Sequence, residues 1–582
     1  MFTKKIKTKI QNFKNILNIS FDSKYKKKLY STFFLMLCGM ILELFGVGLI
    51  FPALKLLTDN EFLSKTYSLF NINELDEEIL ILSIVLIFII FFGLKNFFLW
   101  IVLKKYSSFL VNYEANLQHR LFKGYLNKSV AYFKEKNSSD IIINLKEISS
   151  YFSSVYLNSV INLSLEIILQ SSILILLFYF SWESTLFIFI LFGSLSIIIF
   201  SYNKRKLEEL GKLRNELSQS QLLNVQQGIG GIKEIKLLGR EAYFLNKFDK
   251  NTNNLAEANL KNAIISGTPR LLIEFFAVCS VGIIIFLFLF LNKSLLEILP
   301  TLGLFLVAAY KMVPSFNKIL LMFNRIKFST DMVNKIIKLA TEFNSDKLNY
   351  LQTEKSKKFI FKKEILLENI NFKYHNRDNK VLENLNLSIK KNSFVGIGGE
   401  SGSGKSTLID IIMGIVRPIS GEVRVDGLSI NNSIREWHKQ LGYVSQNIYL
   451  SSDTIRRNIA FGIPDDEIDN IFLHQVIKKC SLEKFVNSLE LGLNTPIGEG
   501  GALISGGQKQ RIGIARALYN KPEILIFDEA TSALDNEIEN EILEEILNLK
   551  KEFTLIFITH RESALNYCDE KYVLINNQLI KK

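Results

Sequence analysis

Cysteine is scarce in this sequence, and no cleavable signal peptide is visible. The 582 residues include only four cysteines, Cys38, Cys279, Cys480 and Cys568, and each is isolated in the chain. They provide neither the framework of a disulfide-bonded protein nor the spacing of a metal site, so we assign them no function. We also expect no cleaved secretory leader.

Acidic residues are also few relative to basic ones. Asp and Glu number 57 against 70 Lys and Arg, which gives a net charge of +13. Nucleic-acid binding would fit such an excess, but much of it lies beside apolar segments. There, lysine and arginine mark the cytoplasmic side of a membrane and meet anionic lipid. We therefore expect membrane lipid, and no nucleic acid, as a partner. The clearest basic cluster precedes the first apolar segment and contains Lys4, Lys5, Lys7, Lys9, Lys14, Lys24, Lys26, Lys27 and Lys28.

Apolar residues are abundant and unevenly placed. They make up 48% of the chain, whose mean hydropathy is +0.19, and they crowd between Tyr30 and Phe323. A chain of this length is too long for one domain. We predict a membrane domain over residues 1–340, a linker over 341–358 and a soluble domain over 359–582.

Six segments are apolar enough to cross a bilayer, which takes about 20 residues of helix. This pattern predicts an α-helical membrane domain with six spans. The expected spans are Leu29–Leu57, Ile79–Leu103, Leu157–Phe180, Ser184–Tyr202, Ile273–Leu291 and Leu295–Met322.

The connections between these spans alternate in length and charge. Thr58–Glu78 is short and acidic, and Ser181–Glu183 and Asn292–Ser294 are turns, so these three are expected outside the cell. The connections from Lys104 and from Asn203 are long, charged and helical in pattern. They are expected to extend the spanning helices into the cytoplasm, where both termini would also lie.

Three stretches near the cytoplasmic side have a further expected role. Leu121–Phe133 and Val225–Leu238 are candidate coupling segments that would press on the soluble domain. Glycines at 228, 230 and 231 either form a turn in the second segment or only kink a long helix. The N-terminal stretch predicts an amphipathic elbow helix at the membrane surface, with a solvated leader as the alternative; its apolar face would hold Ile6, Ile10, Phe13, Ile16 and Leu17.

Four basic residues lie within or beside the spans. Lys95 is inside the second span, Arg270 is at the start of the fifth, and Lys311 and Lys318 share a helical face of the sixth. A charge at the bilayer centre costs about 2.5–3.5 kcal/mol, so it normally faces a cavity or a partner. Without obvious acidic partners, the four are candidate substrate-cavity residues that would receive an anion. The alternative is snorkelling, or pairing with Glu43, Glu166 or Glu274.

The soluble part contains a glycine-rich loop between a predicted strand and a predicted helix. Ser393–Gly398 is a short apolar strand, Gly399 opens the loop, and Lys405 begins the helix. Glycines let backbone N–H groups surround phosphate oxygens, and the helix N-terminus favours their charge. We expect Lys405 to reach the β- and γ-phosphates of ATP and Ser406 to bind Mg²⁺. The loop's ATP-binding set is Gly399, Ser401, Gly402, Gly404, Lys405, Ser406 and Thr407.

A second site feature follows another apolar strand. Ile524–Phe527 ends in Asp528 and Glu529. Asp528 is placed to hold Mg²⁺, and Glu529 is placed where a carboxylate can polarise the attacking water. Together with the glycine-rich loop, this pair predicts an α/β P-loop ATPase domain.

Further motifs resemble the ATPase domain of ABC transporters over Ile365–Leu579. Ile504-Ser505-Gly506-Gly507-Gln508 is similar to the family signature, whose usual first residue is Leu. The resemblance implies that Ser505, Gly506, Gly507 and Gln508 contact ATP bound to the opposite subunit. It also implies roles for single residues: Tyr374 stacks on adenine, Gln446 senses Mg²⁺ and acts in catalysis, His560 contacts the γ-phosphate, and Asp535 and Glu499 communicate across the dimer and with a coupling helix.

The resemblance also implies a working unit and a cargo. One chain carries one membrane domain and one ATPase domain, so we expect a homodimer that binds two ATP. The membrane half looks most like the PglK-type flippases of lipid-linked oligosaccharides, on Thr268–Arg270 and Ala308–Lys318, which implies a bacterial inner-membrane location. An exporter of peptide, toxin, drug or core lipid is the alternative. A soluble-type P-loop ATPase that merely binds membranes would not need the six apolar spans.

Overall fold

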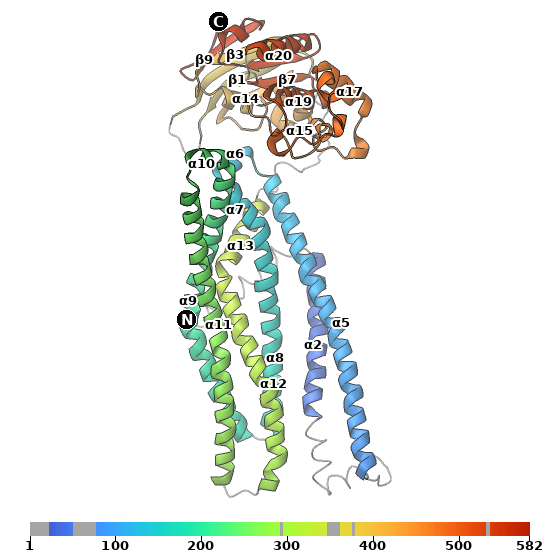
Figure 1. Ribbon diagram of the computed structural model, residues 1–582, viewed down its shortest axis with the longest axis vertical. Helices are drawn as coiled ribbons and strands as arrows, with labels where there is room; N and C mark the ends of the chain where they lie inside the picture. The colour runs from blue at the N-terminus through green and yellow to red at the C-terminus, as the bar shows by residue number, and fades with distance from the viewer. Residues whose placement is uncertain are drawn as a thin grey trace. The chain divides into compact units, whose positions relative to one another are not determined.

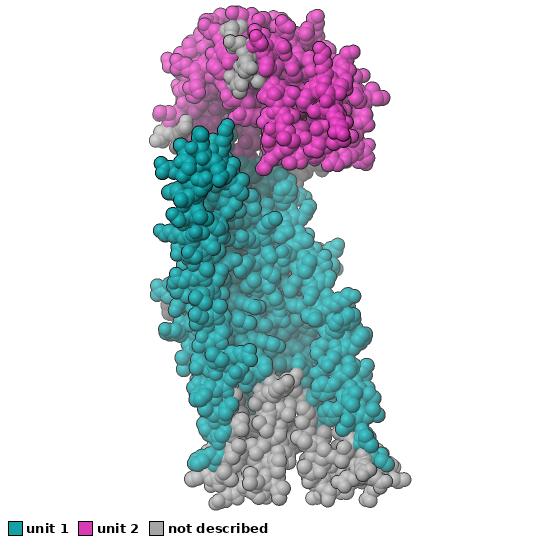
Figure 2. Space-filling model, viewed as in Figure 1, with its two compact units in different colours: residues 1–128, 133–351 teal, residues 129–132, 352–582 magenta. Residues whose placement is uncertain are grey.

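The computed structural model divides the chain into two compact units. Unit 1 comprises residues 1–128 and 133–351, and unit 2 comprises residues 129–132 and 352–582 (Figure 2). The model describes residues 23–49, 77–180, 182–290, 295–345, 361–374, 379–530 and 536–582, without some side chains, among them those of 295–311. The boundary at 351 falls inside the predicted linker, although helix still occupies the linker's first residues, up to Ser345.

Over its described residues, unit 1 is helical. The long helices are α2 (Ser23–Gly48), α5 (Glu77–Leu126), α8 (Asn158–Phe180), α9 (Trp182–Gly230), α11 (Glu241–Phe290), α12 (Leu295–Phe328) and α13 (Thr330–Ser345). Short helical pieces are α7 (Ser138–Ile143), the π-helical turns η1 (Asn144–Ile148) and η2 (Tyr151–Leu157), and α10 (Ile232–Leu238). Helix α6 (Val130–Glu135) is divided between the units, because residues 130–132 belong to unit 2. Helix α2 packs on α5, while α12 packs on α8, α9 and α11 (Figure 1).

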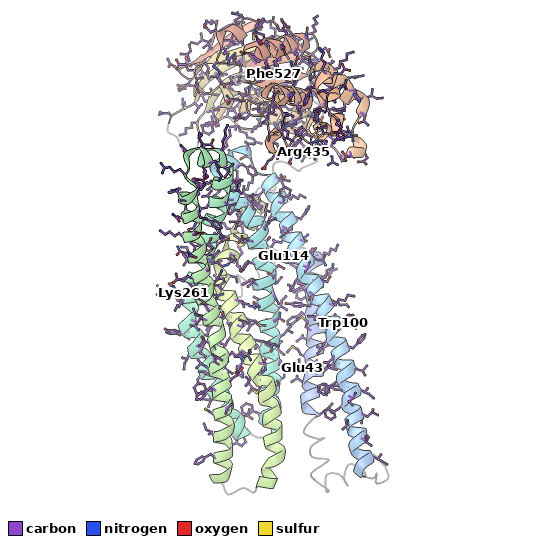
Figure 3. The ribbon with its side chains drawn as sticks, in the orientation of Figure 1. Glu43, Trp100, Glu114, Lys261, Arg435 and Phe527 are labelled. Atoms are coloured by element: carbon purple, nitrogen blue, oxygen red, sulfur yellow. The ribbon has the colours of Figure 1, made fainter. Side chains whose placement is uncertain are left out.

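Each expected span overlaps one of these helices. Within the described part of the chain, three helical stretches are long and apolar enough to cross a membrane: Lys24–Gly46, Val85–Leu126 and Ser138–Ile175. Large apolar side chains remain exposed on them, and Trp100 of α5 is 56% exposed (Figure 3). Such exposure is expected where lipid covers a helix. The predicted elbow helix and most of the 58–78 connection lie outside the described residues.

The two long connections are helical, as expected. Helix α9 has 49 residues and α11 has 50, well beyond the length that a bilayer requires. The glycine-containing segment forms a turn, because α9 ends at Gly230 and α10 starts at Ile232. Helix α5 ends at Leu126, inside the other candidate coupling segment, and α6 begins four residues later.

Unit 2 is built on two sheets. The strands are β1 (Glu364–Phe372), β2 (Leu382–Lys390), β3 (Phe394–Gly399), β4 (Ser420–Val425), β5 (Leu428–Ser429), β6 (Leu441–Val444), β7 (Ile524–Asp528), β8 (Thr554–Ile558), β9 (Glu570–Ile575) and β10 (Gln578–Lys581). An antiparallel sheet has the order β2-β1-β4-β5, and a mainly parallel sheet has the order β10-β9-β3-β8-β7-β6.

Helices and 3₁₀ turns accompany these sheets. The helices are α14 (Lys405–Ile412), α15 (Ile434–Lys439), α16 (Ile455–Ile459), α17 (Asn470–Lys479), α18 (Glu483–Asn487), α19 (Gly506–Tyr519), α20 (Asn536–Leu549) and α21 (Glu562–Leu565). The 3₁₀ turns are η3 (Ile430–Asn432), η4 (Asp465–Glu467), η5 (Gly492–Asn494) and η6 (Glu499–Gly501).

The parallel sheet determines where the candidate ligand site lies. Strands β7 and β8 are buried at every position, and Phe527 lies at 0% exposure in the core of unit 2 (Figure 3). Strands β3, β8 and β7 are neighbours and run parallel. Their carboxyl ends therefore meet at one edge of the sheet, where α/β proteins bind ligands.

Candidate functional site

The glycine-rich loop connects β3 to α14 through backbone conformations that require glycine. Gly404 has φ +107°, and a Cβ atom there would lie 2.9 Å from Val381 Cγ1, so only glycine fits this position. The side chain of Lys405 is 4% exposed, and its ammonium donates to the carbonyls of Gly399 (2.7 Å) and Glu400 (2.8 Å). The loop therefore holds this lysine in place at the start of α14.

A cleft of about 710 Å³ opens beside the loop, within the range of small-molecule sites. Tyr374 OH lies 3.0 Å from Thr407 Oγ1, which joins the predicted adenine side to the loop. The cleft is lined by Tyr374, Asn379, Lys380, Val381, Ser401, Gly402, Gly404, Lys405, Ser406, Thr407, Gln446, Glu529 and Asn577.

Glu529 faces this cleft from the end of β7. Its φ of +50° lies in the left-handed region, which is rare for a residue with a side chain and typical of functional positions. Its carboxylate accepts from Gln446 Nε2 at 2.8 Å and lies 3.8 Å from both Lys405 Nζ and His560 Nδ1. The structure thus brings the three predicted catalytic side chains together, beside the loop lysine. A carboxylate held this way can orient and polarise a water molecule.

Asp528 lies deeper, at 9% exposure. Burial raises its pKa, the negative charges of Glu529 and Asp410 act in the same direction, and the hydrogen bond from Tyr443 OH (3.1 Å) opposes the rise. A buried carboxylate with a raised pKa is suited to a divalent cation, which would restore the ionised form. Ser406, Gln446 and Asp528 are the side chains that can hold Mg²⁺, which when bound neutralises charge on the phosphates.

The signature residues sit at the start of α19. Ser505 caps this helix: its hydroxyl accepts from Gln508 N at 3.3 Å, and its own N–H donates to Gln508 Oε1 at 2.9 Å. Gly506 and Gly507 form the first turn, where free N–H groups favour an anion. None of Ser505–Gln508 is among the described residues that line the ATP cleft. Within one chain, the signature and the cleft therefore remain separate.

The two predicted communication residues differ in what the structure describes. Glu499 begins the turn η6, which Lys509 Nζ closes by donating to the Gly500 carbonyl at 2.9 Å. Asp535 lies outside the described residues. The roles of both stay predictions.

Some of the four basic residues of the membrane domain have acidic partners that the sequence did not lead us to expect. The prediction that they lack acidic partners is wrong for Arg270, which bonds Glu274 one turn away at 2.7 Å. It is also wrong for Lys318, whose partner Glu166, at 3.0 Å, lies on α8 and so could not be found by spacing along α12. Lys95 is 6% exposed, with its ammonium 4.4 Å from the centroid of the Phe92 ring. The side chain of Lys311 lies outside the described residues.

Sequence reasoning missed two features around the site. Tyr443, which bonds Asp528, lies on β6 three residues before Gln446, and the parallel pairing of β6 with β7 brings it there. Arg561, the residue after His560, forms an ion pair with Glu539 of α20, whose side chain is 8% exposed. The proximity of Tyr443 and Gln446 in sequence was a usable signal, but the pairing of Arg561 with Glu539 was not marked by any spacing.

Comparisons with known proteins agree with this geometry. The model of the ABC transporter family matches residues 382–532, and that of the ABC transporter transmembrane region matches residues 13–309, just over half of the chain. Two relatives are ATP-dependent lipid A-core flippases. The one from Ralstonia nicotianae is 28% identical over 477 residues (80% of this chain, 78% of the relative), and the one from Escherichia coli K12 is 28% identical over 470 residues (80% and 79%).

A solved structure shares the fold. It is a bacterial Atm1-family ABC exporter with ATP bound, with a TM-score of 0.76 and 19% identity, covering 96% of this chain and 95% of that one. The P-loop cleft, the carboxylates at the end of β7 and the two family matches support one conclusion. The chain belongs to the ABC transporter family: it is a half-sized transporter with the exporter fold, in which a helical membrane domain is fused to an ATPase domain that couples ATP hydrolysis to transport.

Proposed function

We propose that this exporter works as a homodimer that flips a phosphate-bearing glycolipid across the bacterial inner membrane. The observation that supports a dimer is the separation of the signature residues from the ATP cleft. A second copy of the chain can supply Ser505 and Gly507 to the γ-phosphate side of the first. Each dimer would then hold two complete ATP sites.

The positions of the site residues support the following roles. Lys405 and the loop N–H groups bind the phosphates, and Ser406, Gln446 and Asp528 hold Mg²⁺. Glu529 polarises the attacking water, and His560 contacts the γ-phosphate. Tyr374 stacks on adenine. The shared hydrogen bond between Gln446 and Glu529 supports this division, because the residue that senses the metal also orients the base.

Two kinds of similarity support the proposed cargo. The sequence resembles flippases of lipid-linked oligosaccharides, and the curated relatives are named for lipid A core. Both lipids carry phosphate next to sugar, a headgroup that suits the basic residues Lys311 and Lys318. We put lipid-linked pyrophosphate oligosaccharide first and lipid A core second. Transport would run from the cytoplasmic to the outer leaflet, with the ATPase domain and both termini in the cytoplasm.

A reconstituted flipping assay tests this function. The purified protein is placed in liposomes with a fluorescent polyprenyl-pyrophosphate oligosaccharide or with fluorescent lipid A core, and leaflet exposure is followed by quenching. We expect MgATP to drive flipping of the first lipid. Glu529→Gln is the control without hydrolysis, because loss of a general base costs about 10²–10⁴-fold in rate. Flipping of lipid A core alone would select the second candidate, and flipping of neither would reject both.

A further inference from the structure

A row of polar side chains follows one face of α8. Asn158, Asn162, Glu166 and Gln170 are spaced four apart, so they lie one above another along the helix. Two of them join α8 to α5: Tyr106 OH donates to Asn158 Oδ1 at 2.7 Å and accepts from Asn162 Nδ2 at 2.8 Å. Polar contacts of this kind hold membrane helices together.

The other half of the row contacts α12. Gln170 Nε2 donates to the Met312 carbonyl at 3.2 Å. Glu166 has two partners on α12: one carboxylate oxygen accepts from Ser315 Oγ, and the other lies 3.0 Å from Lys318 Nζ. Both oxygens of Glu166 are therefore satisfied.

Glu166 and Lys318 differ in exposure. The side chain of Glu166 is 15% exposed, whereas that of Lys318 is 59% exposed. An ammonium can donate three hydrogen bonds. Among the described residues, the structure pairs the Lys318 ammonium with Glu166. Lys318 can therefore bond a second anion from its open side while Glu166 stays in place.

The depth of the pair limits what that second anion can be. Glu166 lies nine residues into the expected span Leu157–Phe180, about 14 Å along the helix axis, and Lys318 lies four residues, about 6 Å, before the end of the expected span Leu295–Met322. The pair is therefore expected in the cytoplasmic half of the hydrocarbon core. An exposed ammonium at that depth is costly against lipid tails, so it is expected to face a polar cavity. Only an amphiphile or ion that enters the membrane domain reaches it.

We propose that Glu166 is an internal counter-anion that weakens and reverses the binding of a phosphate headgroup to Lys318. The proposal rests on the proposed function and adds a regulating residue to its cargo site. Glu166 neutralises Lys318 when no cargo is bound. The cargo's phosphate then takes the exposed donors, and the fixed carboxylate repels it, which favours release. Ser315 keeps Glu166 in position throughout.

Binding of defined probes to the full-length protein tests this role. Polyprenyl pyrophosphate, the matching uncharged polyprenol and bis-phosphorylated lipid A are titrated into nanodiscs of neutral lipid, and tryptophan quenching reports binding. Glu166→Gln keeps an oxygen for Ser315 but removes the charge. We expect it to tighten binding of a phosphorylated probe about tenfold, the scale of one charge-assisted hydrogen bond, and to slow its release. Polyprenol binding should not change.

The partner variants complete the test. Lys318→Gln should weaken phosphorylated-probe binding about tenfold, and Glu166→Gln with Lys318→Gln should resemble Lys318→Gln alone. Glu257→Gln is the matched control, since it removes a carboxylate from the exposed Glu257–Lys261 pair of α11 and should change nothing. Dimer yield and ATP binding are checked for every variant.

The outcomes separate this inference from the proposed cargo. Unchanged or weaker binding by a well-folded Glu166→Gln protein overturns the inference and leaves the pair as a contact between helices. Tightening with lipid A alone supports the inference and favours lipid A core as the cargo, which the flipping assay then tests. Binding of neither phosphorylated probe, by the native protein or by Glu166→Gln, overturns the inference, whereas the flipping assay decides the proposed function independently.

Discussion

Single residues of the ATP site are held in states that cost stability. Glu529 has a left-handed backbone, a conformation that costs about 1–3 kcal/mol outside glycine. Asp528 is buried with a raised pKa. Asp528 is the last residue of the buried strand β7 and Glu529 follows it, so the packing of this strand can hold both in place. The strain therefore lies where the chemistry needs fixed carboxylates.

Asp528 gives a prediction with a definite sign. Its folded-state pKa is raised, so the native protein binds this proton more tightly than the unfolded chain does. The associated stability is present below the ordinary Asp pKa and is lost as pH rises through the raised value. At pH 7, Asp528→Asn should raise the free energy of unfolding of nucleotide-free unit 2 by about 0.5–2 kcal/mol. Hydrogen exchange of the β7 amides measures this, and the gain should shrink at acid pH.

Asp569 is the matched control for this measurement. Burial alone would raise its pKa, but hydrogen bonds from Lys550 and from the Phe394 N–H lower it overall. Asp569→Asn should therefore destabilise the unit at pH 7. Added MgATP should slow hydrogen exchange of the β7 amides more in the native protein than in the Asp528→Asn variant. A loss of protection in nucleotide-free Asp528→Asn would contradict the argument.

The same residues show how far sequence could reach into the site. Lys405, Asp528 and Glu529 were predicted because each follows a recognisable strand in a local pattern. Tyr443 was marked only by its nearness to Gln446 in sequence, and its contact with Asp528 depends on the pairing of β6 with β7. Pairing of the membrane cations with Glu166 or Glu274 was only the alternative interpretation, and the sequence could not match Lys318 to Glu166, which is 152 positions away on another helix. Contacts between distant segments depend on packing, which no spacing records.

At the scale of elements, apolar runs predicted strands β3 and β7 and the helices that contain the six expected spans. Ile524–Phe527 became β7, and the glycines of the second coupling segment became the turn before α10. The π-helical turns η1 and η2, which precede α8, were not expected. A π-turn needs one extra residue per turn and has no sequence signature of its own. Helix α13 entered the predicted linker, where Glu342 pairs with Lys128 at 2.9 Å and the centroid of the Phe343 ring lies 4.9 Å from that of the Tyr125 ring.

The ion pair between Arg561 and Glu539 gives a prediction at this scale. It joins the loop after β8, which carries His560, to the first turn of α20. Breaking a mostly buried pair typically costs about 3–5 kcal/mol, because one charge is left without its partner. Glu539→Gln should therefore destabilise unit 2 and lower kcat for ATP hydrolysis more than it changes KM. The exchanged pair, Arg561→Glu with Glu539→Arg, should recover part of the lost kcat.

An exposed ion pair provides the comparison. Lys479 and Glu552 are 42% and 53% exposed, so Glu552→Gln should cost no more than about 1 kcal/mol and leave kcat intact. Steady-state ATPase kinetics and thermal unfolding in detergent distinguish the two pairs. Equal effects of Glu539→Gln and Glu552→Gln would show that the inner pair does not position His560.

At the scale of the whole molecule, one chain does not bring all the site residues together. Its cleft contains the loop, Gln446 and Glu529, while Ser505 caps α19 and does not line that cleft. The family resemblance assigned the signature to a second subunit. A sequence by itself carries no record of which copy supplies a residue, so this part of the site required the resemblance.

Mixed dimers test that assembly. When Ser505→Arg chains combine with Lys405→Ala chains, one composite site receives both lesions and the other receives none. Either variant alone forms dimers in which both sites are damaged. Doubly tagged mixed dimers should therefore trap ATP at about one site per dimer, whereas either parent should trap almost none. Trapping with vanadate holds ADP in each site that has cleaved ATP once, so the labelled nucleotide retained per dimer measures the number of working sites.

The control places both lesions on one chain. Chains with Ser505→Arg and Lys405→Ala, combined with Lys405→Ala chains, have no undamaged composite site and should trap no ATP. Light scattering verifies that each preparation is dimeric. If the verified mixed dimer of single variants also traps none, or if an active monomer is found, then Ser505 does not complete a site on the second chain. Recovery in the first mixture and not in the second follows only from ATP sites built from both subunits.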